Sequence, residues 1–486
     1  MVPAQRRERG NRSLILAGGG MRVAWQAGVI RALDEAGYGF AHADGTSGGT
    51  INLAMLLSGI SAPEMCARWA SLAVKDFASL LPPSEYLQSP TKWMAVGDAD
   101  GLVHKVFPHL GIDVDHIRGV SSPEGTFNVC NFTTKTCEAI SHRDVDVDFL
   151  VAGVSLPIFM PPVVKGAFTY TDAVWIKDAN LMEGVRRGSD ELWVAWCIGN
   201  TGSYGAGPLE QYVHMIEMSA NGALFAELEQ IADINRRRTK GEALFGHSQP
   251  VRVHVVVPEY PLPLDPEFFL GGIDAHTLVA MGYRDARAYL ATMSPEGVAL
   301  DHRATQMTDP PLGFRFRERM RGRVSFGTQD HDATLDAVVE VPDAERFFAD
   351  PAAGASVVGS IGLSTWRYPV FFSGGTFRVV ASPGAGSEVR YEVRFHLDGE
   401  ELTLRAAKRL HDDPGFDLYG DVTRAHVTVL KEDVEVGSGE LRLGAGDLRR
   451  LLTSIRPTGA HGVVDRAGLV AKVGKTLLGD LWRSYT

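Results

Sequence analysis

A serine between glycines stands out among the residues that could do chemistry. Ser47 is the centre of the stretch Gly45-Thr-Ser-Gly-Gly49, and a serine hydroxyl held out by a sharp strand-to-helix turn can attack a carbonyl carbon. The two terminal glycines remove side chains that would collide in so tight a turn. The pattern alone is of moderate specificity, because the chain has 53 glycines and a serine at this position can equally cap a helix.

A glycine-rich loop precedes this serine and has the features of an anion site. Gly18-Gly-Gly-Met-Arg22 follows a short apolar run and opens a stretch of helical periodicity at 23–36. Backbone N–H groups in such a loop can bind a phosphate or the oxyanion of an acyl intermediate. The phosphate-loop and dinucleotide patterns do not fit, so the nearby serine favours the oxyanion. Arg22 either steadies the loop, meets a charged head group or is solvated.

A serine nucleophile needs a base, and two kinds of side chain are candidates. Asp172 ends a strand-like run and can reach the sheet edge where Ser47 lies, and Asp178 is its local competitor. A partly desolvated carboxylate within hydrogen-bond reach can accept the proton. Histidine is the commoner partner, and the chain offers four candidates for a triad: His142, His214, His254 and His276.

The elements that must position these residues alternate in type over the first 300 residues, as in a layered α/β domain. We expect residues 84–118, which mix aromatic side chains with polar turns, to cap the site. The pattern predicts strands at 13–17, before Asp44, and at 126–132, 135–140, 167–172, 191–198 and 251–257, and helices at 23–36, 51–57, 62–78, 209–237 and 275–291.

The second half of the chain has a different pattern. From residue 322 to 456 apolar residues mostly recur with period two, which predicts an antiparallel sandwich or small barrel. Alternate arginines from Arg315 to Arg323 would share one face of an extended strand, either solvated or against lipid phosphates, and the alternative is a helix broken at Gly322. The predicted organisation is a basic tail at 1–12, a hydrolase-like domain at 13–308, a linker at 309–325 and a β domain at 326–486 with a helix at 469–485. This β domain could bind lipid, act as a scaffold or dimerise.

Composition narrows the class of protein. The 486 residues are 45% hydrophobic and carry a net charge of −11, which argues against general nucleic-acid binding. The four cysteines are scattered and read as free thiols. No apolar run approaches the ~20 residues of a membrane span, and no signal-length stretch follows the N-terminus. We therefore expect a cytoplasmic protein that contacts membranes only peripherally.

Four motifs in order resemble the patatin-like phospholipases over about residues 12–295. They are Leu16-Ala-Gly-Gly-Gly-Met-Arg, Gly45-Thr-Ser-Gly-Gly, Ser155-Leu-Pro-Ile-Phe-Met-Pro-Pro-Val and Tyr170-Thr-Asp-Ala. The stretch from Lys408 to Tyr419 is weakly similar to a β module attached to some bacterial sterol-oxidase-like and hydrolase chains. That similarity hints at apolar substrates, while His411, Asp412 and Asp413 read as a turn.

The patatin-like resemblance implies a three-layer domain with a largely parallel sheet and a serine acyl hydrolase, either a phospholipase or a lipid esterase. Ser47 would be the nucleophile and Asp172 its base, with an acyl-enzyme intermediate and no metal or cofactor. The oxyanion hole would comprise Gly18, Gly19, Gly20 and Met21, with Arg22 and Gly48 supporting the substrate or the loop. The chain has Val23 and Ala173 where the family usually has glycines. The alternative is a non-catalytic lipid-binding or carrier protein on the same fold.

Overall fold

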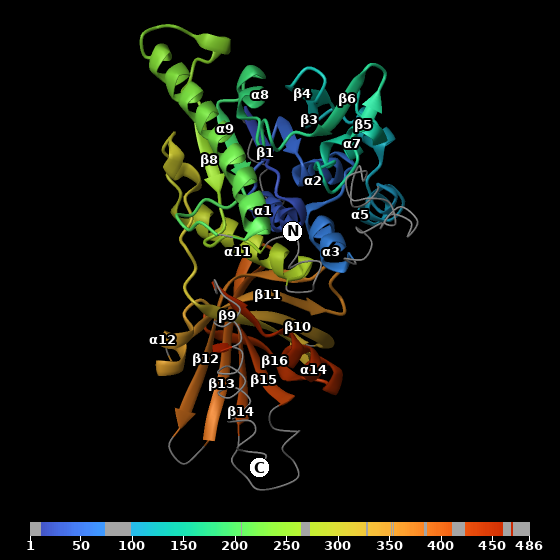
Figure 1. The fold of residues 1–486 in the computed structure, drawn as a ribbon. Coiled ribbons are helices and arrows are strands. Elements are labelled where there is room, and N and C mark those ends of the chain that lie inside the picture. The colour runs from blue at the N-terminus through green and yellow to red at the C-terminus, as the bar shows by residue number, and fades with distance from the viewer. Residues whose placement is uncertain are drawn as a thin grey trace. The chain divides into compact units, whose positions relative to one another are not determined.

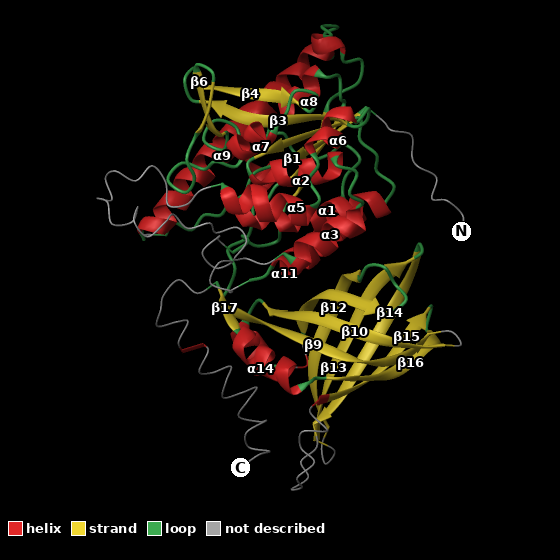
Figure 2. Cartoon of the chain, turned by 90° about the vertical axis from the view of Figure 1, so that its right-hand side faces the viewer, coloured by secondary structure: helices red, strands yellow, loops and turns green. Residues whose placement is uncertain are grey.

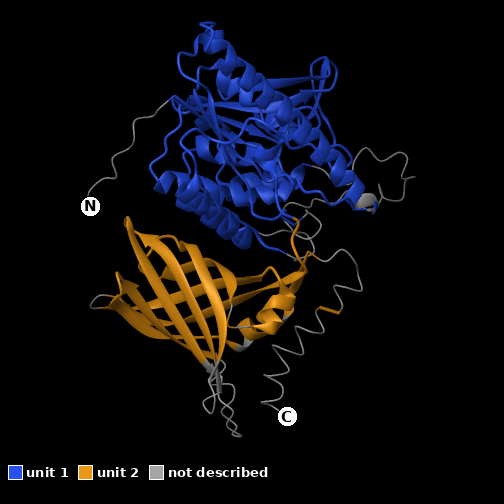
Figure 3. Cartoon of the chain, turned by 90° about the vertical axis from the view of Figure 1, so that its left-hand side faces the viewer, with its two compact units in different colours: residues 1–308 blue, residues 309–486 orange. Residues whose placement is uncertain are grey.

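The chain divides into two compact units, Met1–Thr308 and Asp309–Thr486 (Figure 3). The structure is a computed structural model, and Figure 1 labels its helices and strands. It describes residues 11–72, 99–205, 207–263, 273–326, 329–350, 352, 354–382, 386–410, 423–459 and 468–469. Four predicted features lie outside the described residues: residues 1–10 of the basic tail, the helix at 469–485 beyond its first residue, the part of the expected cap before residue 99 and the His411–Asp413 turn.

An eight-stranded mixed sheet forms the centre of the first unit. The strands β3, β2, β1, β7 and β8 run parallel in that order, while β4, β5 and β6 are antiparallel to their partners. The strand bounds are β1 Arg12–Leu16, β2 His42–Thr46, β3 Glu124–Asn131, β4 Thr136–Ser141, β5 Val163–Lys165, β6 Phe168–Asp172, β7 Glu191–Ala195 and β8 Arg252–Val256. The central strands are buried on both faces, which explains why the run at Leu14–Leu16 is continuously apolar.

Helices cover both faces of this sheet (Figure 2). Tyr289 of α11 packs edge-on against Trp193 of β7, and α1 packs against α3 and α11. A separate core joins α8 and α9 to strands β1, β7 and β8. The main helices are α1 Ala24–Glu35, α2 Gly48–Leu57, α3 Ala62–Ser71, α7 Val147–Gly153, α8 Leu181–Arg186, α9 Pro208–Arg238 and α11 Ala275–Thr292. The predicted α/β fold with helical layers and a largely parallel sheet is confirmed.

Polar caps fix where several of these helices begin. The side chain of Ser61 accepts a hydrogen bond from the Glu64 N–H at the start of α3, and Asp146 caps α7 in the same way. Asp274 accepts from the Thr277 N–H at 2.8 Å and so starts α11. Such caps satisfy amides that the first helical turn leaves without partners.

Shorter helical turns complete the first unit. The described part of the expected cap, from residue 99 onward, forms three consecutive turns, η4, α5 and α6. The short helical elements described in the first unit are η1 Gly20–Val23, η4 Leu102–Val106, α5 Phe107–Leu110, α6 Val114–Gly119, η5 Leu244–Gly246 and η6 His302–Thr305. None of the helices in the described ranges has both the length and the apolar character that a membrane-spanning helix requires.

The second unit is a closed antiparallel barrel of eight strands. Each strand from β9 to β15 pairs with the next one, and the pairing of β16 with β9 closes the ring. The strands are β9 Gly313–Phe326, β10 Gln329–Val341, β11 Ala355–Leu363, β12 Val370–Ser382, β13 Gly386–Leu397, β14 Glu400–Leu410, β15 Arg424–Lys431 and β16 Val434–Arg442. The helices α12 Ala344–Ala349 and α14 Ala445–Ser454 and a short strand, β17 Arg456–Thr458, accompany them. This barrel confirms the predicted antiparallel β fold.

Strand β9 corrects the linker that the sequence analysis placed at 309–325. The apolar residues that alternate with its arginines point into the barrel core, among them Phe314, Phe316 and Met320, and so complete the barrel wall. The arginines on the other face are largely paired. Arg317 and Arg319 contact Asp336 of β10, and Arg321 contacts Asp447 of α14 at 2.6 Å.

Candidate active site

Ser47 lies in a sharp turn between β2 and α2. Its backbone dihedral angles, φ 50° and ψ −130°, fall in a region that residues other than glycine rarely adopt. Two glycines permit the turn, since a Cβ at Gly45 would lie 2.9 Å from the Gly49 carbonyl oxygen, and one at Gly49 would lie 2.1 Å from that of Leu16. The strand–turn–helix context expected for Ser47 is therefore present.

The strands that carry Ser47 and Asp172 end against the same edge of β3. One edge of β3 pairs with β4. The other edge pairs first with β2, where Thr46 lies opposite Asn128, and then with β6, where Asp172 lies opposite Val129. Since β2 is parallel to β3 and β6 is antiparallel, their C-terminal ends meet. The Ser47 hydroxyl donates a hydrogen bond to Asp172 Oδ2 at 2.6 Å.

The Asp172 carboxyl is buried and held from two sides. Only 1% of the residue is exposed, and its second oxygen, Oδ1, accepts a hydrogen bond from the Val174 N–H at 2.9 Å. Burial is the main effect on this group and raises its pKa to about 7, although the bonds from Ser47 and Val174 act in the opposite direction. A carboxyl with this pKa can accept and return a proton near neutral pH.

The glycine loop beside Ser47 is fixed by contacts from the protein interior. The Gly18 N–H donates to the Asp178 carbonyl at 3.2 Å, and the Cys197 thiol donates to the Gly18 carbonyl at 3.1 Å. Arg22 is buried, and its Nε donates to the Gly19 carbonyl at 3.0 Å, so this arginine holds the loop instead of extending into solvent. The Gly18 amide is thus already engaged within the fold.

The other residues of the predicted oxyanion site, Gly19, Gly20 and Met21, come directly after Gly18 in the chain. Gly19 has φ 150° and Gly20 has φ 58°, conformations that glycine adopts at little cost. Gly20 and Met21 open the η1 turn. Gly48 packs so tightly against this turn that a Cβ there would lie 2.6 Å from the Gly20 carbonyl oxygen and 2.7 Å from a Val23 methyl group. The loop and the serine turn are therefore in direct contact.

Asp178, the competing acidic candidate, lies under the same loop without bonding to Ser47. It is completely buried, and within the described residues neither carboxyl oxygen has a hydrogen-bond partner. Its Oδ1 lies 2.0 Å from the position that a Cβ on Gly18 would occupy, and the Ser47 Cβ lies 2.8 Å from the same position. Of the two carboxyls, Asp172 is the one that is hydrogen-bonded to the Ser47 hydroxyl.

The four candidate histidines are engaged elsewhere or lie on a different element. His142 bonds to the backbone at Gly125 and Val120. His214 contacts Glu217 at 2.9 Å. His254 stacks on Trp193, and His276 is in the first turn of α11. The Ser47 hydroxyl bonds to a carboxylate, and among the described residues no imidazole takes that place.

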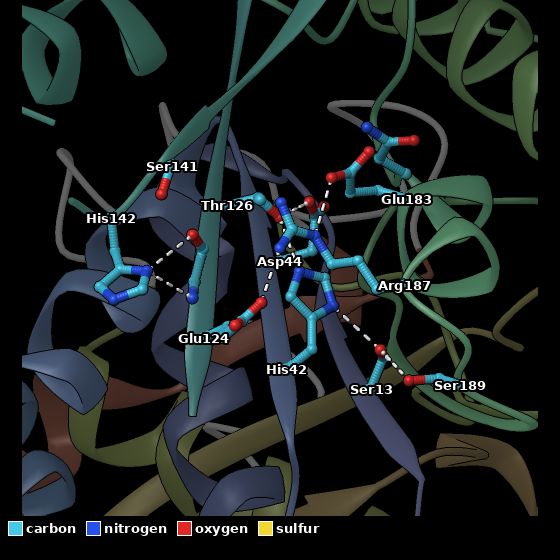
Figure 4. Close-up of polar contacts among 12 residues, drawn as sticks. Ser13, His42, Asp44, Glu124, Thr126, Ser141, His142, Glu183, Arg187 and Ser189 are labelled. Carbon is cyan, nitrogen blue, oxygen red and sulfur yellow. Dashed lines mark hydrogen bonds and ion pairs between the residues drawn. The ribbon is translucent and has the colours of Figure 1, made fainter. Parts of the chain in front are cut away.

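A fifth histidine, His42, forms a serine–histidine pair that is purely internal (Figure 4). Its Nδ1 lies 2.9 Å from Ser13 Oγ, and its Nε2 lies 2.9 Å from Thr126 Oγ1. Thr126 in turn donates to Asp44 at 2.5 Å. Burial lowers the pKa of His42 to about 3, so the ring is neutral. Ser13 is fully buried, which prevents contact with a substrate, and the chain of bonds instead ties β2 to β1 and β3.

Aromatic side chains gather beside Asp172. Tyr212 of α9 makes edge contacts with Trp175 and Phe159, with ring centroids 5.8 Å apart in each case. Burial raises the pKa of Tyr212, and the charge of Asp172 raises it further. The cluster offers an apolar surface that includes Trp175, three residues after Asp172 in the chain.

Several supporting residues were missed by the sequence analysis. Gln26 donates to the Ala17 carbonyl at 2.6 Å, and Asn52 donates to the Val23 carbonyl at 2.8 Å. Each amide side chain lies in the N-terminal half of its helix, among residues that are mostly apolar. A polar amide in such a stretch is the signal that could have identified both residues. Trp175 and Tyr212 give no comparable local signal, because α9 meets the site only in the folded chain.

The fold and site together define a class of α/β protein with a serine at a strand–helix turn and a carboxylate partner. Residues 14–183 match the family model described as patatin-like phospholipase, so this part of the chain is a patatin-like phospholipase domain. No curated protein matches the chain.

Among solved structures, the chain is similar to VipD from Legionella pneumophila, with 12% sequence identity and a TM-score of 0.32. The match covers 58% of this chain and 66% of VipD, just under two thirds of the latter.

Proposed function

We propose that the protein is a serine acyl hydrolase, a phospholipase or lipid esterase, that cleaves fatty-acyl esters with Ser47 as nucleophile and Asp172 as base. The observation that carries the proposal is the 2.6 Å hydrogen bond from the Ser47 hydroxyl to a buried carboxylate. The patatin-like match over residues 14–183 supports a lipid as the substrate class.

In the first step Asp172 accepts the Ser47 proton while Oγ forms a bond to the ester carbonyl carbon. The C=O electron pair moves onto oxygen, and the resulting oxyanion is stabilised by backbone N–H groups. The Gly18 amide is occupied, so we assign this role to the amides of Gly19 and Gly20 in the loop and of Gly48 after the nucleophile. Met21 and Arg22 support the loop.

Collapse of the intermediate then breaks the bond to the leaving alcohol, which takes the proton from Asp172. The acyl-enzyme formed on Ser47 is hydrolysed by a water that Asp172 deprotonates in turn. The product acid leaves, and Ser47 recovers its proton. The aromatic cluster of Phe159, Trp175 and Tyr212 is the surface that we assign to the acyl chain, because it is apolar and its Trp175 follows Asp172 by three residues.

Peripheral contact with a lipid surface is part of this proposal. Ile158 is 60% exposed and Phe159 is 44% exposed, in the loop whose Ser155 carbonyl accepts a hydrogen bond from the Asp172 N–H at 3.0 Å. Ile158 also has φ 80°, a strained value for a β-branched residue. Exposed apolar side chains in strained backbone next to a candidate site support direct contact with acyl lipid.

A fluorogenic short-chain ester tests the proposal. Ser47→Ala should lower kcat/KM by about 10⁴-fold or more, whereas Ser71→Ala, which removes an exposed hydroxyl at the end of α3, should retain full activity. A fluorophosphonate should label the wild type once per chain and leave Ser47→Ala unlabelled. Turnover that survives in Ser47→Ala would remove this serine from the mechanism, and no turnover on any ester would favour a lipid-binding protein.

A further inference from the structure

Asp178 is a buried acid that the reaction described above does not use. Its residue is 0% exposed, and both oxygens lack hydrogen-bond partners among the described residues. An ionised carboxylate without partners in such a place would cost several kcal/mol. The neutral, protonated form avoids most of that cost.

The position of Asp178 links it to both halves of the site. Its backbone carbonyl accepts the Gly18 N–H, and its Oδ1 packs against the α-carbon of Gly18, on the face that also meets the Ser47 Cβ. A carboxyl here lies directly beneath the loop that we assign to the oxyanion. Any charge on it would act on that oxyanion through protein instead of through water.

We propose that Asp178 is a positioning residue that works only while protonated, and that its ionisation switches the site off at alkaline pH. This inference rests on the proposed hydrolase function. Before the attack, Asp172 carries the one negative charge of the pair. After the attack the proton is on Asp172 and the negative charge is on the oxyanion. A neutral Asp178 leaves that single charge stabilised, whereas an ionised Asp178 would place a second one beside it.

The charged groups around Asp178 support a proposal in which Asp172 ionises at a lower pH than Asp178. Burial raises its pKa well above the ordinary range, the charge of Asp172 raises it further, and Arg22 and the Gly18 N–H oppose the shift. Lys177, the neighbouring cation in sequence, is paired with Glu227 of α9.

The test is the pH profile of kcat/KM for the wild type and Asp178→Asn, whose side chain is similar in size and always neutral. The midpoint of the low-pH limb, which reports the ionisation of Asp172, should be the same in the two proteins within about 0.3 pH unit. At high pH the wild type should lose about tenfold in rate per pH unit, while Asp178→Asn should stay on its plateau for at least about one unit more.

Two results of the pH profiles would overturn the proposal. One is a low-pH limb that moves down in Asp178→Asn, because it would mean that Asp178 is already charged near neutral pH. The other is a high-pH behaviour that is the same in both proteins. Asp44→Asn is the matched control, since Asp44 is also a buried carboxyl with a raised pKa, of about 7, but is bonded to Thr126 and Asn128; this variant should keep the wild-type high-pH limb.

A spectroscopic measurement separates this inference from the hydrolase proposal. The infrared difference spectrum of wild type minus Asp178→Asn at pH 8 should contain the C=O band of a protonated carboxyl. That band requires no substrate. If the band is present but no ester is turned over, the hydrolase function fails and the protonation of Asp178 stands. If the band is absent, the switch fails, whatever the activity.

Discussion

Ser47 and Asp172 are 125 positions apart in sequence, and they meet because β2 and β6 end head to head on one edge of β3. Thr46 and Asp172 lie opposite the consecutive β3 residues Asn128 and Val129. The geometry of the pair is thus set by strand register, which is rigid where both faces of a sheet are buried. The site should be preformed before a substrate arrives.

Replacing the proposed base gives the first prediction. Asp172→Asn keeps an oxygen for the Ser47 hydroxyl but cannot accept its proton, so kcat should fall by about 10³-fold or more with a small change in KM. Unfolding in urea should show the variant to be more stable than the wild type at pH 8, by on the order of 1–3 kcal/mol, since a buried ionised carboxyl is removed. Asp148→Asn, at an exposed position of α7, is the control, and equal kcat in the two variants would contradict the assignment.

The pH dependence of the free enzyme follows from the Asp172 carboxyl. Burial raises its pKa to about 7, and only the ionised form can take the serine proton. The kcat/KM for a soluble ester should therefore rise with pH through about 7 and fall about tenfold per pH unit below it.

The same shift has a consequence for stability. The unfolded chain ionises Asp172 near pH 4, whereas the folded chain holds the proton up to about pH 7. The contribution of Asp172 to the free energy of unfolding should therefore decrease as the pH rises between these two values. This pH-dependent decrease should be absent from Asp172→Asn. An activity limb near pH 4 would show that the carboxyl is not buried in the working enzyme.

A methyl group on the glycine loop should disrupt the site from within. In Gly18→Ala the new Cβ would lie 2.0 Å from Asp178 Oδ1 and 2.8 Å from the Ser47 Cβ, so the loop or the turn must move. We expect a loss of about 10²-fold in kcat/KM and of about 1–3 kcal/mol in stability. Gly222→Ala on α9, where nothing lies within 4 Å of the added atom, should be as active as the wild type and slightly more stable.

The exposed loop next to the dyad can be tested with vesicles. The double variant Ile158→Ser, Phe159→Ser should bind neutral phosphatidylcholine vesicles about tenfold more weakly, because two apolar side chains no longer enter the lipid. In the single variant Ile158→Ser, which leaves the aromatic cluster intact, turnover of a short soluble ester should stay within about twofold of the wild type. Val434→Ser, which changes another exposed apolar residue, at 65% exposure in the second unit, is the control. Equal vesicle binding by the double variant and the wild type would refute this lipid contact.

The local part of the site could be predicted from the sequence because its signals are local. The turn at Ser47 needs glycines at fixed positions, and Gly45 and Gly49 supply them within five residues. The α/β alternation and the period-two pattern of the barrel are equally local, and both fold classes were predicted correctly.

The parts that could not be predicted depend on long-range pairing. No spacing in the sequence says that β6 shares the β2 edge of β3, so the choice between Asp172 and a histidine rested on the family resemblance. The linker prediction at 309–325 failed for a related reason. The arginines of β9 have acidic partners such as Asp336 and Asp447 on other elements, which appear only once the barrel has closed.

That closure also sets an order of events during synthesis. The strands of the first unit end with Val256 of β8, so its sheet can assemble while the rest of the chain is still on the ribosome. Strand β9 must wait for β16, which ends at Arg442, more than 100 residues after β9 itself. A nascent chain stalled after Thr308, where the first unit ends, and before Arg442 would carry a complete first unit followed by a β sheet that is still open at its edges, a form that is exposed to misassembly.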